Sequence, residues 1–333
     1  MDDARRKNTL ERFFLRFATI PFLPLLVAAL VLGAPHVEAK KTAPKAKPHP
    51  VAARAAHNDE DETDTPVSTA VNAGQQANGS LVLAAHGATV IDALTGDLLY
   101  EKNAYNRFYP ASTTKILTAL LVIEAGDLDR EVVIQPEDTR AEPSIIGFHP
   151  GERYTRRSLL YALMLKSAND VAQALARDNA GSVAAFADKM TQRAAALGAL
   201  DSHFANPNGL PNPNHYTTPH DLALIARTAM QQPVFRQIVG TVEYPWVSAQ
   251  GVSTSLRNHN RLLWDQHWKV DGCTGLKTGY TVLAQQVLVS SALRNHREVI
   301  SVVMHSDKPG IWVDSKTLLT YGLTHLPGGP RFD

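Results

Sequence analysis

Ser112 and Lys115 stand three residues apart within the segment 109–121, where an apolar stripe of helical period begins. On a helix, residues at this spacing share one face and lie about 5–6 Å apart. A serine hydroxyl is a weak nucleophile until a neighbouring base takes its proton, and an uncharged lysine amine is such a base. The unpaired N–H groups of a first helical turn also favour a negatively charged oxygen. The pair therefore predicts covalent catalysis by Ser112, with Lys115 as its base.

The protonation state of Lys115 decides whether this chemistry works, because only the uncharged amine accepts a proton. Lowering a lysine pKa from about 10.4 to near 7 costs about 4–5 kcal/mol. Burial or a second cation nearby can cause such a shift. A capping serine followed by a solvated lysine gives the same spacing, so other parts of the chain have to support the catalytic interpretation.

A second polar motif, Ser167-Ala168-Asn169, lies between two stretches of helical pattern, and the chain contains this Ser-x-Asn spacing once. The Asn169 amide can bind a substrate carbonyl or orient Lys115. The Ser167 hydroxyl can pass a proton toward a leaving amine. We expect both side chains to face the reacting groups.

A third motif, Lys277-Thr278-Gly279, opens a stretch rich in β-branched residues, and it too is unique in the chain. Lys277 supplies a fixed positive charge for a substrate carboxylate and helps to depress the pKa of Lys115. Thr278 adds a hydroxyl donor. Gly279 allows the strand backbone to approach a substrate closely, so the strand edge can bind a peptide as an added strand.

The patterns around these motifs predict the elements that position them. A hairpin is expected around 94–97 and a helix from about Ser112 to Gly126, where glycine ends it. Further helices are expected after caps at Thr155, at Asn169 or Asp170, at Ser182 and at Thr218. Strands are expected from about residue 270, and the segment 312–323 predicts a last helix.

Strands at both ends of this region with helices between them indicate an α/β fold of the α+β kind. We expect an antiparallel sheet with flanking helices and an additional all-helical subdomain. The active site would lie between the two, because the first two motifs fall in the helical pattern and the third opens a strand.

Residues 1–39 show the pattern of an export signal or an N-terminal anchor. Five basic residues precede the apolar run 17–34, and Val37-Glu38-Ala39 is a small-residue cleavage pattern. We expect cleavage after Ala39, and retention as a membrane anchor is the alternative, because the run approaches membrane-spanning length. The remainder is expected to be exported to the periplasm or cell envelope.

Residues 40–78 are rich in Pro, Ala and charged residues and contain no aromatic residue. Such a segment buries too little apolar surface to offset the entropy of ordering, so we expect a disordered spacer before a folded domain over 79–333. The formal net charge of the 333 residues is +1, which predicts no nucleic-acid partner. The single cysteine, Cys273, excludes an intramolecular disulfide.

The three motifs, in this order, resemble the D-alanyl-D-alanine carboxypeptidases among the low-molecular-mass penicillin-binding proteins. The resemblance covers about 81–326 and includes the segments "YPASTTKILTALL", "SANDVAQALA", "NPNGL" and "LKTGYT". It implies a fold like that of β-lactamases and transpeptidases, no cofactor and no metal. It also implies a periplasmic serine peptidase that acts on peptidoglycan stem peptides and is acylated by penicillins.

By this resemblance Ser112 attacks the carbonyl between the two terminal D-alanines of a stem pentapeptide. Lys115 takes the serine proton, D-alanine leaves, and water hydrolyses the acyl-enzyme. The oxyanion lies between the backbone N–H groups of Ser112 and Tyr280. The implied catalytic residues are Ser112, Lys115, Ser167 and Asn169, and the implied substrate-binding residues are Lys277, Thr278, Gly279 and Tyr280.

The sequence departs from the family pattern at two places. Ile311 stands where the family has an arginine that helps to hold the substrate carboxylate, and losing such a contact costs about 1.5–3 kcal/mol. Ala284-Gln285 stands where the family has Ala-Gly after the third motif. We expect an altered carboxylate site and an altered turn beside the cleft.

Four other functions fit parts of the pattern. A D,D-endopeptidase that cleaves peptidoglycan cross-links shares all three motifs, and a non-catalytic peptidoglycan-binding module could keep the fold without turnover. A class A β-lactamase would carry Ser-Asp-Asn and an additional glutamate motif, which the chain lacks. A zinc amidase would have to use His203, His215, His220 and Asp221, whose spacing fits no standard zinc site.

Overall fold

The computed structural model describes residues 81–141 and 143–326, which belong to one compact unit. The predicted export signal over 1–39 and the predicted spacer over 40–78 lie outside these residues, so both stay predictions. Within the described ranges, no helix is both long and apolar enough to cross a membrane.

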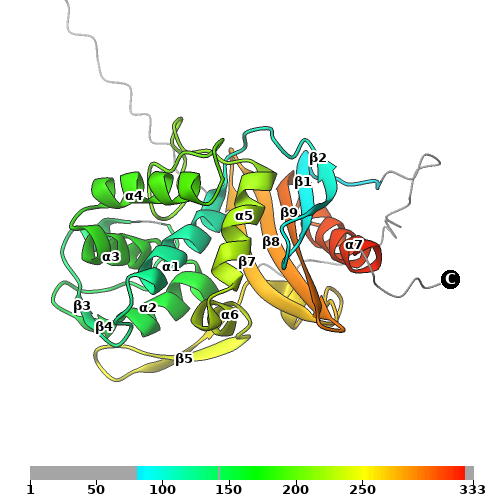
Figure 1. Cartoon of the computed structure of the whole chain (residues 1–333). Coiled ribbons are helices and arrows are strands. Elements are labelled where there is room, and N and C mark those ends of the chain that lie inside the picture. The colour runs from blue at the N-terminus through cyan, green and yellow to red at the C-terminus, as the bar shows by residue number, and fades with distance from the viewer. Residues whose placement is uncertain (1–80, 142, 327–333) are drawn as a thin grey trace, which may run out of the picture. The chain divides into compact units, whose positions relative to one another are not determined.

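A five-stranded antiparallel sheet joins the two ends of the described chain (Figure 1). Its order is β2-β1-β9-β8-β7, so the first hairpin adds to the last three strands through the pairing of β1 with β9. The bounds are β1 Gly87–Asp92, β2 Leu98–Lys102, β7 Cys273–Thr281, β8 Gln285–Arg294 and β9 Arg297–Ser306. The predicted hairpin and the predicted C-terminal strands are both confirmed.

Side chains of β9 alternate between two separate cores, as the period of two along a strand requires. Ile300 and Val302 belong to the larger core, which the helical subdomain and α5 (Pro219–Met230) complete. Val299 and Val303 point to the opposite face and pack with residues of α7 (Gly310–His325). The sheet is therefore covered by helices on both faces, with α5 on the side of the helical subdomain (Figure 1).

The helical subdomain surrounds α1 (Lys115–Glu124), whose residues from Lys115 to Val122 are all buried. A helix buried on every side is held by packing rather than by exposed polar contacts. The predicted α+β architecture is confirmed, and the subdomain is mainly rather than wholly helical, because two small sheets lie among its helices. The neighbours of α1 are α5, the π-helical turn η3 Ala162–Lys166, α3 Asn169–Ala180, α4 Val183–Ala196 and α6 Pro233–Val239, and α2 Arg156–Tyr161 packs against η3, α3 and α6.

Three of the predicted caps are confirmed. The Thr155, Ser182 and Thr218 side chains each accept a hydrogen bond from the backbone N–H three residues later, at the starts of α2, α4 and α5. These bonds satisfy one of the unpaired donors of each first turn. The sequence patterns therefore located these helix starts correctly.

Two small antiparallel sheets were not predicted. Strands β3 (Glu131–Val133) and β4 (Arg153–Thr155) form one, and β5 (Glu243–Val247) and β6 (Ser253–Arg257) form the other. The first pair is three residues long in each strand, and the second is mostly exposed. Strands this short or this exposed do not show the alternation of apolar and polar residues by which a strand is predicted from sequence. The short 3₁₀ turns are η1 Ala111–Thr114, η2 Asp138–Arg140 and η4 Arg261–Leu263.

Candidate active site

Ser112 and Lys115 meet as their spacing predicts. Ser112 lies in the 3₁₀ turn η1, directly before α1, and Lys115 is the first residue of α1. Lys115 Nζ lies 3.0 Å from Ser112 Oγ, which is hydrogen-bonding distance. The tight turn, with Pro110 before it, brings the hydroxyl onto the face of the amine.

Two fixed acceptors hold the Lys115 amine from the other side. Nζ donates to Asn169 Oδ1 at 2.7 Å and to the Asn208 carbonyl oxygen at 2.7 Å, and the lysine side chain is fully buried. An uncharged amine has two N–H bonds and one lone pair. When both N–H bonds point at these acceptors, the lone pair is left for the Ser112 hydroxyl. This is the arrangement that a general base requires.

Asn169 is positioned by the chain entering α3. The preceding Ser167 has φ +63°, a left-handed conformation that ends η3 and lets α3 start in a new direction. The Asn169 backbone N–H donates to the Ser144 carbonyl oxygen. Its side chain thereby faces Lys115, as predicted. Among the described residues the Ser167 hydroxyl forms no hydrogen bond, so its role in proton transfer stays a prediction.

The predicted cap at Asn169 or Asp170 is wrong. Ala168 occupies the cap position of α3, and no side chain caps it. The Asn169 oxygen is used by Lys115, and the Asp170 carboxylate accepts from the backbone N–H groups of Ile146 and Gly147. Long-range partners have therefore taken both side chains away from the helix end.

Strand β7 brings the third motif to the same place from the sheet. It is an edge strand, paired only with β8 among the described strands, so its other edge faces η1. A Cβ atom on Gly279 would lie 2.9 Å from the Ser112 backbone nitrogen and 3.1 Å from that of Thr113. The predicted reason for glycine here was close approach of a substrate. The structure adds that glycine is also required for β7 to pack against η1.

The other predicted substrate-binding residues of β7 range from buried to exposed. Lys277 is buried, and its Nζ donates to the Thr278 carbonyl oxygen at 2.9 Å. The Thr278 hydroxyl is buried and has no hydrogen-bond partner among the described residues. Buried hydroxyls normally have a partner, so this unpaired oxygen is a candidate for a hydrogen bond to substrate. Tyr280 is 42% exposed and follows at the rim.

A loop that the sequence analysis did not assign to the site completes it. Asn208 supplies its carbonyl oxygen to Lys115, and the next residue, Gly209, has φ +89°. A Cβ atom on Gly209 would lie 1.8 Å from the Ala111 carbonyl oxygen, so only glycine fits. Asn206 fixes the loop by accepting from the Gly209 N–H. The only sequence signal for this loop was Asn-Pro-Asn-Gly-Leu, which predicts a turn but does not predict that the turn contacts Lys115.

His215 ties this loop to η1 as a neutral imidazole. Its Nδ1 accepts from the Ala205 backbone N–H at 3.0 Å, so the proton is on Nε2, which donates to Thr114 Oγ1 at 2.8 Å. Burial, with smaller contributions from the charges of His203 and Lys115, lowers the pKa of His215 to about 3. The ring therefore stays uncharged beside Lys115 at physiological pH.

The residues required for a zinc amidase do not converge. His215 contacts Thr114, whereas His203 Nδ1 contacts the Asn214 carbonyl oxygen and the Asp221 carboxylate accepts from Ser202. Within the described ranges no group of three or more His, Cys, Asp or Glu side chains could hold a metal ion. Burial raises the pKa of the Cys273 thiol to about 11, which keeps it from acting as a thiolate nucleophile.

A family model described as D-alanyl-D-alanine carboxypeptidase matches residues 72–308. The chain belongs to this family. It is a serine-type D-alanyl-D-alanine carboxypeptidase, a hydrolase of cell-wall synthesis. This identity confirms the function inferred from the three motifs.

Relatives agree with this assignment. The carboxypeptidase DacB2 of Mycobacterium tuberculosis is 36% identical over 244 residues, covering 72% of this chain and 82% of the relative. A crystal structure of a D-alanyl-D-alanine carboxypeptidase from the same organism aligns with a TM-score of 0.70 and 35% identity, over 77% of this chain and 97% of that one. The Streptomyces K15 DD-transpeptidase aligns with a TM-score of 0.67 and 34% identity, over 72% and 97%.

Both departures from the carboxypeptidase pattern have a structural account. Ile311 is the second residue of α7 and is buried in the core that α7 shares with the sheet, so it contributes packing where the family pattern has an arginine. Gln285 keeps a left-handed backbone, with φ +54°, and its Nε2 donates to the Val282 carbonyl oxygen. Such a conformation costs a non-glycine residue about 1–2 kcal/mol. The turn after the third motif therefore keeps a shape that glycine favours.

Proposed function

We propose that this carboxypeptidase removes the terminal D-alanine of peptidoglycan stem pentapeptides through an acyl-enzyme on Ser112. The observation that carries the proposal is the environment of the Lys115 amine. Its nitrogen lies 3.0 Å from Ser112 Oγ while Asn169 and Asn208 hold it from the other side. Such a buried, oriented amine is a general base directed at one hydroxyl.

The reaction runs in two steps. Ser112 Oγ attacks the carbonyl between the terminal D-alanines and passes its proton to Lys115. The oxyanion binds to the backbone N–H groups of Ser112 and Tyr280. When the C–N bond breaks, the leaving amine receives a proton from Lys115 by way of Ser167. Water, activated by Lys115, then hydrolyses the ester and releases the shortened peptide.

The carboxylate of the terminal D-alanine binds at the start of the third motif. Lys277 supplies positive charge, and the Thr278 hydroxyl, which has no partner among the described residues, donates to a carboxylate oxygen. Penicillins carry a carboxylate and a strained amide in a similar relation, so they acylate Ser112 in place of the peptide. Neither a metal nor a cofactor takes part in this proposal.

The location follows from the substrate. Stem peptides lie outside the cytoplasm, and residues 1–39 carry the pattern of an export signal. We therefore place the domain in the periplasm or cell envelope, with the N-terminal segment as a membrane attachment if it is retained.

A fluorescent penicillin and a D-Ala-D-Ala pentapeptide test the proposal on the soluble domain. We expect labelling and release of D-alanine by the wild type, and neither by Ser112→Ala. Persistent labelling of Ser112→Ala would show that another residue is the nucleophile. Mass spectrometry of digested peptidoglycan separates carboxypeptidase from endopeptidase action, because loss of one terminal alanine and loss of dimeric muropeptides have different masses.

A further inference from the structure

Asp170 is a buried carboxylate that directly follows the second motif, Ser167-Ala168-Asn169. Its Oδ2 accepts hydrogen bonds from the backbone N–H groups of Ile146 and Gly147, each at 3.0 Å, and its Oδ1 accepts from that of Val171 at 2.8 Å. Among the described residues it forms no ion pair, so backbone N–H groups stabilise its charge. The reaction proposed above gives this carboxylate no role.

Keeping a carboxylate in this place costs free energy. Burial raises the pKa of Asp170, although hydrogen bonds from four backbone N–H groups oppose the shift, those of Ile146, Gly147, Phe148 and Val171. An apolar side chain would fill the same space without this desolvation cost. Carboxylates with a perturbed pKa gather at functional sites, where the charge is used. The use of this charge has to be sought in the loop that it binds.

The loop 144–147 is bonded to the second motif at both of its ends. Before the motif, Ser144 Oγ donates to the Lys166 carbonyl oxygen at 3.1 Å. At its end, the Asn169 backbone N–H donates to the Ser144 carbonyl oxygen at 2.6 Å. Directly after it, the Asp170 carboxylate accepts from the loop. We call these three contacts the motif clamp.

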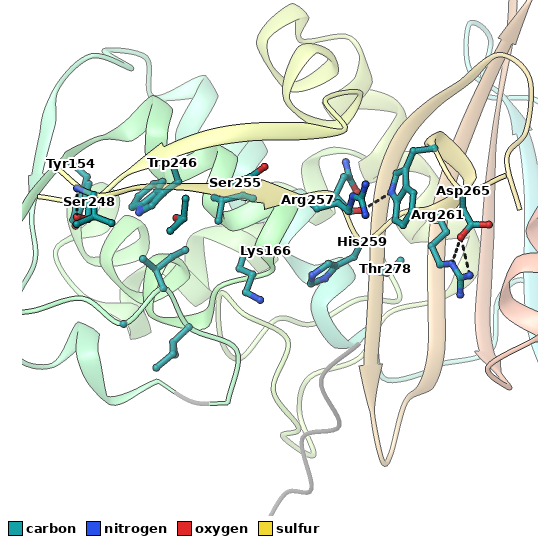
Figure 2. Close-up of a pocket in the computed structure, with 18 of the residues that line it drawn as sticks. Tyr154, Lys166, Trp246, Ser248, Ser255, Arg257, His259, Arg261, Asp265 and Thr278 are labelled. Atoms are coloured by element: carbon teal, nitrogen blue, oxygen red, sulfur yellow. Dashed lines mark hydrogen bonds and ion pairs between the residues drawn. The ribbon is translucent and has the colours of Figure 1, made fainter. Parts of the chain in front are cut away.

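The loop depends on these bonds because little packing holds it. It lies outside any helix or strand, and Ile145 is 36% exposed. Ile145, Ile146 and Gly147 line a pocket of about 640 Å³, into which Figure 2 shows the Lys166 side chain pointing. A segment beside a pocket, with few buried apolar contacts, has low local stability unless polar bonds fix it. The motif clamp therefore determines where the loop lies.

The second motif needs such support because its backbone is strained. Ser167 has φ +63°, in the left-handed region, directly after the π-helical turn η3. This conformation costs a non-glycine residue about 1–2 kcal/mol. It persists only where the surrounding contacts determine it. The motif clamp supplies such contacts on both sides of Ser167, at Lys166 before it and at Asn169 and Asp170 after it.

The catalytic groups depend on the motif clamp to different degrees. Lys115 belongs to α1 and also donates to the Asn208 carbonyl oxygen, so it keeps these anchors when the second motif moves. The Ser167 hydroxyl forms no hydrogen bond among the described residues, so its backbone sets its direction. Loss of the clamp therefore disturbs proton transfer to the leaving amine more than the attack by Ser112.

We propose that Asp170 is a positioning residue that, through the motif clamp, orients the Ser167 hydroxyl for proton transfer to the leaving amine. The inference rests on the proposed function, because it uses the proton path from Lys115 through Ser167. In that step the C–N bond breaks, Ser167 gives its proton to the departing nitrogen, and Lys115 returns a proton to Ser167. Asp170 itself neither gives nor receives one.

Two substrates with the same acyl group separate proton delivery from the attack by Ser112. One is a peptide ending in D-Ala-D-Ala, whose leaving amine has to be protonated. The other is the thioester in which D-thiolactate replaces the last D-alanine. It keeps the terminal carboxylate, and its thiolate leaves without a proton. The quantity measured for both substrates is kcat/KM, on the purified protein and its variants.

The variants break the motif clamp at two points and remove the hydroxyl that it orients. They are Asp170→Asn, Ser144→Ala and Ser167→Ala. The matched control is Asp178→Asn, because Asp178 is a carboxylate of the same helix with a side chain only 8% exposed. It pairs with Arg156 at 2.7 Å instead of binding the loop.

Asp170→Asn places an N–H donor where a carboxylate oxygen accepted, so it breaks part of the clamp. We expect kcat/KM for the amide to fall about 10²-fold, as for a displacement of about 1 Å, and that for the thioester to change by less than about threefold. Ser167→Ala should show the same split, and Ser144→Ala a smaller one. Asp178→Asn should lower the melting temperature and leave both kcat/KM values at those of the wild type.

Equal losses on both substrates in Asp170→Asn, or no loss on either, would overturn the inference, while the split in Ser167→Ala would still support the proposed function. If circular dichroism shows that Asp170→Asn is unfolded, Ser144→Ala decides by the same criterion. A Ser167→Ala variant without the split would contradict the proton path and the inference together. A wild type that hydrolyses neither substrate would contradict the proposed function itself.

Discussion

The Lys115 nitrogen is the atom on which the proposed chemistry depends. Burial removes the solvent that would stabilise its charge, and Asn169 and Asn208 direct its two N–H bonds away from Ser112. His215 stays neutral nearby and adds no further charge. Burial favours the uncharged amine, and the two acceptors direct its N–H bonds so that its lone pair faces Ser112.

Replacing Lys115 by methionine removes the base and keeps an unbranched side chain of similar length. We expect the second-order rate of acylation by a penicillin to fall by about 10²–10⁴-fold, the usual contribution of a general base. Stopped-flow measurement of the fluorescent adduct gives this rate, and circular dichroism checks that the variant is folded. A folded Lys115→Met variant with wild-type acylation would rule out Lys115 as the base.

At the scale of elements, the site is the junction of η1, the start of α3, the 206–210 loop and β7. The sequence predicted the motifs and the caps of α2, α4 and α5, because both depend on residues close in sequence. It missed Asn208 and misassigned the cap of α3, because Lys115 reaches Asn169 and Asn208 across long stretches of chain. The small sheets were missed because their strands are short or exposed.

Gly279→Ala tests the junction of β7 with η1. The added Cβ would lie 2.9 Å from the Ser112 nitrogen, so β7 has to move away from the nucleophile. Displacements of about 1 Å cost roughly 10²-fold in rate, and we expect kcat/KM for D-alanine release to fall by that order. The same shift disturbs the packing of β7 on η1, so we expect the melting temperature to fall by a few degrees as well. Wild-type kcat/KM in this variant would show that the contact is not required.

At the scale of the whole molecule, the pH dependence of stability reports on the buried His215. Its folded pKa of about 3 lies below the unfolded value of 6.5, so the unfolded chain binds more protons between these pH values. The free energy of unfolding therefore falls as the pH decreases through this window, by up to about 4 kcal/mol at pH 3.

Urea denaturation at a series of pH values between 7 and 4 measures this effect. We expect the midpoint to decrease steadily as the pH falls, and to decrease less in His215→Gln, which has no imidazole to protonate. Equal slopes in the two proteins would assign the acid sensitivity to groups other than His215.

The most direct test of the account is to locate the covalent adduct. The purified protein is incubated with a penicillin, its intact mass is measured, and the labelled peptide is sequenced by tandem mass spectrometry. We predict one adduct per chain, on Ser112, that is absent from Ser112→Ala. An adduct on any other residue, or D-alanine release that survives in Ser112→Ala, would contradict the account.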